Sequence, residues 1–154
     1  MNYKTDNPKF HEEVFKAVGE IVEICFDYLS DEEVRGLEVI YAMGIAEEDW
    51  LTFKPFYHIK DELLSYGEIK NKDDHDSQIG IQMSGTEFLM ELIDIFKSYD
   101  QETPKLIKIQ YYPKIEKVEY QFEYDLKWSN SEHRLPANLH EGYFEEIKNS
   151  LGSK

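Results

Sequence analysis

The side chains most able to do chemistry show no spacing typical of a metal site in this chain of 154 residues. None of the five histidines forms a His-x-x-x-His pair or a cysteine and histidine pair, so no zinc site is predicted. The run Asp73, Asp74, His75 and Asp76 offers oxygen ligands to a divalent cation, but it lacks the central glycine and distal glutamate of a calcium-binding loop. The sequence therefore favours a solvated loop there, and we expect no metal and no cofactor.

Nucleophilic catalysis is not indicated either. Cys25 is the only cysteine, and it falls on the apolar stripe of a predicted helix, so we interpret it as a core thiol. The chain has no Gly-x-Ser-x-Gly motif, and Gly80 and Gly85 are not followed by the Gly-Lys-Ser/Thr of a phosphate-binding loop. With 32 acidic residues, the number of carboxylates alone indicates no acid–base pair. The sequence patterns therefore single out no catalytic residues.

Charge is the strongest signal in the composition. The chain has 32 acidic and 17 basic residues, which gives a formal charge of −15. Residues 31–100 carry −11 of this charge, whereas residues 101–154 carry only −1. This balance disfavours direct binding to nucleic acid or to anionic membranes, because both present negative charge to a partner. It favours protein partners with a basic surface, although acidity is also a common means of staying soluble.

The candidate contact residues lie in two acidic segments and on one predicted strand. Segments 47–49 and 73–76 are typical of turns or loops, and the glutamates of 117–124 fall on the polar side of an alternating strand. Two interpretations of that side stay open: the solvated side of a sheet with Trp128 in local packing, or an acidic platform with Trp128 as an anchor. The candidate partner-binding residues are Glu47, Glu48, Asp49, Asp73, Asp74, Asp76, Glu119, Glu123, Asp125 and Trp128.

Three helices are expected to position these residues. Asn7 and Pro8 are typical of a helix start, and apolar residues three and four apart continue that helix to about residue 29. Thr86 and Glu87 open a second predicted helix, which runs to about residue 99 with a wide apolar face. A third helix is predicted from about residue 140.

Two hairpins are expected between the helices. Apolar and polar residues alternate over 37–54 and over 107–124, which indicates four strands. Pro55 restricts the second strand to an edge, an end or a bulge, because proline donates no hydrogen bond to a sheet. Residues 61–79 show no sustained period, and we expect a mobile acidic loop over 68–79.

The order of elements predicts an α+β fold within a single domain over residues 1–154. In the order α-ββ-α-ββ-α, an antiparallel sheet of about four strands packs one face against helices and leaves the other to solvent or to a partner. The chain shows no secretory signal and no apolar run long enough to span a bilayer, so we expect a cytoplasmic protein.

Two of the predicted strands carry short motifs: Val39, Tyr41 and Ala42 stand in the first strand, and the last strand has the form Lys-Val-x-x-x-Phe-x-Tyr-Asp over residues 117–125, followed by a tryptophan. With these motifs the chain resembles the YezG-like family of bacterial immunity proteins. The resemblance covers most of the chain. It implies a non-enzymatic antitoxin that binds a cognate toxin domain, often a nuclease, and blocks its active site or substrate groove.

A second hypothesis comes from the tyrosines of the last hairpin. Tyr111, Tyr112, Tyr120 and Tyr124 gather there, which is compatible with a small acidic enzyme or a ligand-binding domain. Such a protein would need a concave pocket between sheet and helices with converging polar groups.

Overall fold

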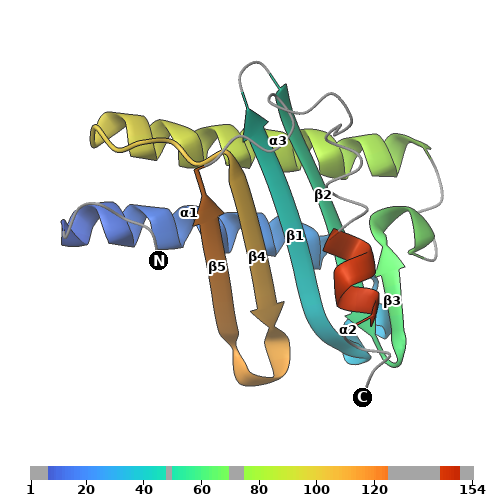
Figure 1. Ribbon diagram of the computed structural model, residues 1–154. Helices are drawn as coiled ribbons and strands as arrows, with labels where there is room; N and C mark the ends of the chain where they lie inside the picture. Colours follow the sequence, from blue (N-terminus) through green and yellow to red (C-terminus); the bar gives the residue numbers. More distant parts are fainter. Residues whose placement is uncertain (1–6, 48–49, 70–74, 125–142, 150–154) are drawn as a thin grey trace.

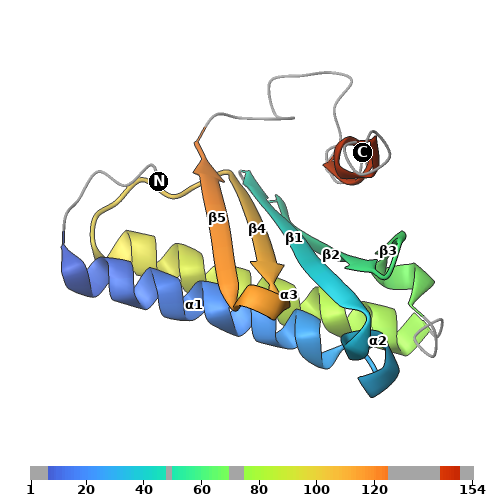
Figure 2. The same cartoon turned by 90° about the horizontal axis from the view of Figure 1, so that it is seen from below.

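The protein folds as a five-stranded antiparallel sheet with two long helices on one face, as a computed structural model shows (Figures 1 and 2). The structure describes residues 7–47, 50–69, 75–124 and 143–149. The strands are β1 (Leu37–Glu47), β2 (Trp50–Ile59), β3 (Glu62–Ser65), β4 (Leu106–Tyr112) and β5 (Lys117–Glu123). Their order in the sheet is β3-β2-β1-β4-β5. The α+β class is confirmed, and one strand more than the four expected is present.

Helix α1 (Pro8–Asp27) begins as its sequence predicts. The side chain of Asn7 accepts a hydrogen bond from the backbone N–H of Lys9, and Pro8 occupies the first turn, where its missing N–H costs nothing. A short helix that the sequence analysis missed, α2 (Asp31–Arg35), follows at once. Its signal was a capping box, in which Ser30 and Glu33 satisfy each other's backbone N–H groups.

Strand β2 continues through Pro55 instead of ending there. Pro55 stands opposite Ala42 of β1, and β3 pairs with β2 only from Phe56 onward. The proline therefore lies on the part of β2 that β3 does not reach, so no hydrogen bond to β3 is lost. The expectation of an edge position was right for residues 50–55, whereas the alternating pattern was taken to stop at residue 54 and β2 runs on to Ile59.

Helix α3 (His75–Ser98) begins eleven residues before the predicted Thr86. The predicted loop over 68–79 therefore needs correction: residues 75–79 are helical, and the one-turn helix η1 (Tyr66–Glu68) ends inside it. Residues 70–74 lie outside the described residues. Burial stabilises the first turns of α3, because Ile81 packs in the main core and is only 6% exposed. Gly80 and Gly85 interrupt the apolar pattern of this segment, so its helical period is not evident from the sequence.

The second hairpin forms as predicted. Strands β4 and β5 pair in register from Leu106 opposite Glu123 to Tyr112 opposite Lys117, with the turn η2 (Pro113–Ile115) between them. Ile107, Ile109 and Phe122 are buried against the helices, as their alternation indicated.

The face of the sheet away from α1 and α3 is partly covered, which corrects the expectation of an open face. Residues 143–149 form a helix over β1 and β2, and Figure 2 shows it on the side of the sheet opposite to α1 and α3. Tyr143 packs there with Tyr41 and Phe56 in a second cluster of buried residues. Strand β1 is therefore apolar on both sides. No described helix is both long enough and apolar enough to cross a membrane.

Candidate interaction surfaces

The described candidate acids lie in three separate places. Glu47 ends β1 and pairs with Trp50 across the β1–β2 turn, Asp76 lies in the first turn of α3, and Glu119 and Glu123 lie on β5. The end of β1, the start of α3 and strand β5 are well separated in Figure 1. These residues therefore do not form a single patch. The remaining candidates, Glu48, Asp49, Asp73, Asp74, Asp125 and Trp128, lie outside the described residues.

The carboxylates of β5 are largely balanced by lysines. Lys117 Nζ lies 2.9 Å from a carboxylate oxygen of Glu119, and Lys108 Nζ lies 3.9 Å from one of Glu123. Residues 106–123 contain three lysines and three glutamates, so the hairpin is neutral. The outer side of β5 is thus polar, as expected, but its described part presents little net negative charge.

The acidic character instead follows the two long helices. Helix α1 carries five acidic side chains against two lysines, and α3 carries four against one, so each has a net charge of −3. The two helices pack side by side on one face of the sheet (Figure 2). The protein therefore has an acidic helical side and, on β4 and β5, a neutral polar side.

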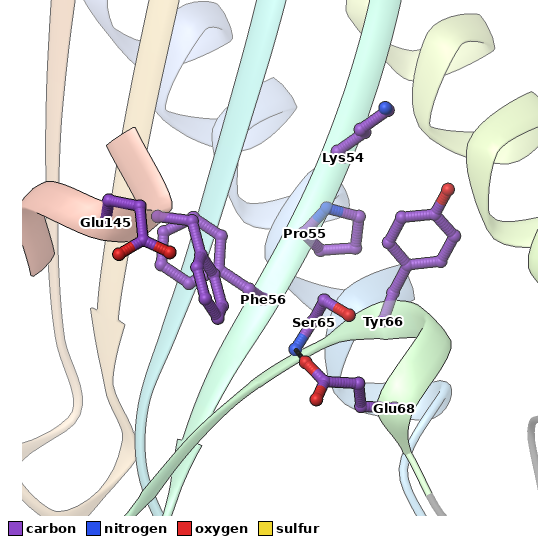
Figure 3. A pocket seen from close by; sticks show the side chains of 8 residues that line it. Lys54, Pro55, Phe56, Ser65, Tyr66, Glu68 and Glu145 are labelled. Carbon is purple, nitrogen blue, oxygen red and sulfur yellow. Dashed lines mark hydrogen bonds between the residues drawn. The ribbon is translucent and has the colours of Figure 1, made fainter. Parts of the chain in front are cut away.

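A hollow of about 470 Å³ lies where β3 stops beside β2 (Figure 3). Pro55 and the ring of Tyr66 form one wall, and Glu145 of the helix at 143–149 approaches from the other side. The Glu68 carboxylate accepts a hydrogen bond of 3.0 Å from the backbone N–H of Ser65. Partial burial raises the pKa of the Tyr66 hydroxyl. Lys54 supplies the cationic group among the lining residues.

This hollow lies between the sheet and the helix at 143–149, and none of the four tyrosines that suggested a ligand pocket lines it. A smaller cavity of about 270 Å³ lies between α1 and α3, lined by residues such as Tyr28 and Ile81. The tyrosines that motivated a ligand site are divided between the faces of the sheet. Tyr111, Tyr120 and Tyr124 pack on the helical side, whereas Tyr112 packs on the other.

Cys25 is placed as predicted, in the core. Its side chain is fully buried, and this burial raises the pKa of the thiol far above its ordinary value. A protonated, enclosed thiol is a poor nucleophile. Its backbone carbonyl accepts a hydrogen bond of 2.8 Å from the buried hydroxyl of Tyr57. Within the described residues, no three His, Cys, Asp or Glu side chains are grouped to hold a metal ion.

Sequence reasoning missed one surface, the outer side of α3. Ile79, Met83 and Met90 are 38%, 59% and 54% exposed there. Their spacing of four and seven residues places them on one helical stripe. The spacing was visible in the sequence, but Ile79 lay in the segment predicted as a loop and Met83 lay before the predicted start of the helix at Thr86.

No protein-family model matches the chain, and no curated protein is significantly similar to it. Membership of the YezG-like family therefore stays a prediction.

Proposed function

We propose that this protein is a non-enzymatic immunity protein that binds a cognate bacterial toxin domain in the cytoplasm and neutralises it. The toxin we propose is a nuclease with a basic surface. The resemblance to YezG-like proteins supports this proposal, as does the charge of −15.

The observation that carries the proposal is the uneven placement of charge. Helices α1 and α3 together carry −6 on one side of the sheet, while the β4–β5 hairpin is neutral. A nuclease must present lysine and arginine to phosphates, and an acidic surface of this kind is complementary to such a groove. Long-range attraction raises the rate of encounter, most strongly at low ionic strength.

Inhibition by this route requires no catalytic chemistry in the inhibitor. The inhibitor occupies the active site or the substrate groove, and the toxin can then no longer bind nucleic acid. Buried aromatic and aliphatic contacts supply most of the affinity in such complexes, while charge supplies rate and selectivity.

Co-expression tests the proposal. The toxin is expressed from the reading frame upstream of this gene, alone and together with this chain. Growth is expected only in the second case, and the two proteins should form a complex in solution. Continued toxicity, with no complex, would reject the proposal.

The alternative is a small enzyme or ligand-binding domain that uses the hollow beside β3. Its volume of about 470 Å³ falls in the range of ligand pockets, and this observation favours the alternative. None of the tyrosines that suggested a pocket lines this hollow, and the Glu68 carboxylate already accepts a hydrogen bond from the backbone N–H of Ser65. A screen of small metabolites by thermal shift, repeated with Lys54→Ala, tests it: stabilisation by a ligand that the variant loses would favour the alternative.

A further inference from the structure

The outer side of α3 combines exposed apolar side chains with a row of acids. Ile79, Met83 and Met90 form the apolar stripe, and each has an acidic residue three or four positions away. Asp76 stands next to Ile79, and Glu87 stands next to both methionines. Asp94 completes the row beside Met90, and all three acids are exposed. We call these six residues the α3 stripe.

The α3 stripe lies outside the buried core of the protein. The buried side of α3 is formed by other residues, such as Leu89, Leu92 and Phe96, which pack in the main core. Solvated apolar side chains that follow one another along a helix are unfavourable unless something covers them, and patches with a polar rim commonly mark binding sites. Methionine is frequent at such sites because its unbranched side chain adapts to the surface of the partner.

The acids decide what kind of partner fits. In the described part of the chain, no cation forms an ion pair with Asp76, Glu87 or Asp94. Among the described residues no neighbouring cation neutralises these charges, and acidic side chains repel anionic lipid and nucleic acid. A second copy of this chain would bring two acidic rows together, which is unfavourable. A partner with both basic and apolar side chains complements the acids and the apolar residues of the stripe.

We propose that the α3 stripe is a docking site for a basic amphipathic helix of the protein partner. The apolar residues of the stripe, from Ile79 to Met90, extend over about 16 Å at about 1.5 Å per residue, or about three turns of helix. An apolar row on the partner helix packs on the methionines, and flanking lysines or arginines meet the acids. The inference rests on the proposed function only for the identity of the partner, the toxin.

The test uses the whole protein with methyl-labelled methionines, observed by NMR. The probe is a synthetic helical peptide with a leucine stripe and lysine flanks, and its counterpart has glutamates in place of the lysines. The methyl signals of Met83 and Met90 are expected to shift on addition of the lysine peptide only. The signal of Met43 is the internal control, because its side chain is 2% exposed and lies in the cluster on the other side of the sheet.

Matched variants distinguish binding at the α3 stripe from a general attraction of the basic peptide to an acidic protein. Met83→Gln with Met90→Gln keeps the charge and is expected to weaken peptide binding at least about tenfold, as loss of central anchors does. Phe15→Gln removes an equally exposed apolar side chain from α1, at 56% exposure, and should leave binding unchanged. Glu87→Gln with Asp94→Asn should weaken binding and its salt dependence more than Asp61→Asn with Glu62→Gln does.

Several results would overturn the inference. They are equal binding of the two peptides, equal loss in the Phe15→Gln variant, or self-association of the protein that Met83→Gln with Met90→Gln abolishes. Failure of the two proposals can be told apart. If co-expression protects cells and the double methionine variant protects equally well, the docking site is wrong and the function stands. If the peptide docks as expected and no toxin is neutralised, the docking site stands and the function is wrong.

Discussion

Gly85 of α3 lies directly against the ring of Phe53 in β2, so closely that no larger residue fits. A Cβ atom added at Gly85 would lie 2.0 Å from Cδ2 of Phe53. Gly85 is buried and Phe53 is 2% exposed, so neither group can move into solvent. This contact therefore limits how closely α3 can approach the sheet.

Gly85→Ala is therefore expected to destabilise the protein by about 2 kcal/mol, as overpacking of a core does. The control is Gly80→Ala in the same helix, where no atom lies within 4 Å of the added Cβ. Alanine is favoured over glycine inside a helix, so this change should stabilise by roughly 0.5 kcal/mol or more. Urea unfolding of both variants gives the comparison. Equal effects at the two positions would contradict the close contact.

The helix at 143–149 is expected to contribute to stability through Tyr143. Its ring centroid lies 5.3 Å from that of Phe56, and its hydroxyl accepts a hydrogen bond of 3.3 Å from Gln110 Nε2. Tyr143→Ala should cost about 3 kcal/mol, whereas Tyr143→Phe, which keeps the ring, should cost less than about 1.5 kcal/mol. Denaturant unfolding measures both. A neutral Tyr143→Ala change would mean that this helix does not dock on the sheet in solution.

Stability is expected to fall at alkaline pH. Burial raises the pKa of Cys25 and Tyr57 well above their ordinary values of 9.0 and 10.0, and raises the pKa of Tyr41 to about 12. Above about pH 9 the unfolded chain loses protons that the folded chain keeps, so the free energy of unfolding decreases as pH rises. This decrease in the free energy of unfolding is absent below about pH 9, and it continues as the pH approaches the raised pKa values of the folded protein.

Unfolding in urea from about pH 8 to about pH 11 checks this slope. Each such group contributes up to about 1.4 kcal/mol per pH unit between its two pKa values. Tyr41→Phe removes one group and should make the decline shallower above pH 10, the ordinary value for tyrosine. A stability that does not change over this range would show that these side chains are accessible to solvent.

The β1–β2 turn is expected to steer the partner. Neutralising Glu47, Glu48 and Asp49 together should slow association with the toxin and flatten its dependence on salt, because long-range attraction between charges acts mainly on the rate of encounter. Stopped-flow measurements at several salt concentrations give both quantities. An unchanged rate would leave solubility as the role of these acids.

The sequence predicted those elements whose pattern is strong and local. Asn7 with Pro8 marked the start of α1, and the alternation of Ile107 and Ile109 marked β4 and its buried side. The four-residue strand β3 was missed because Leu63 and Leu64 are too few to show a period. Its position depends on pairing with β2, which is a tertiary effect.

The surfaces were harder to predict than the elements. The distribution of charge along the chain indicated the acidic loops as candidate partner-binding sites. It could not show that Lys117 and Lys108 form ion pairs with Glu119 and Glu123. The apolar run of β1 did hold a signal for burial on both faces, since Tyr41 and Met43 alternate with Ile40 and Ala42. The α3 stripe could be recognised only once the helix was extended back to His75.

The most direct measurement is a titration of the purified toxin domain with this protein, with cleavage of nucleic acid as the readout. The account predicts that cleavage falls linearly and stops near one equivalent, and that the two proteins elute together as one complex in gel filtration. Undiminished cleavage in the presence of excess protein, with the two proteins eluting separately, would contradict it.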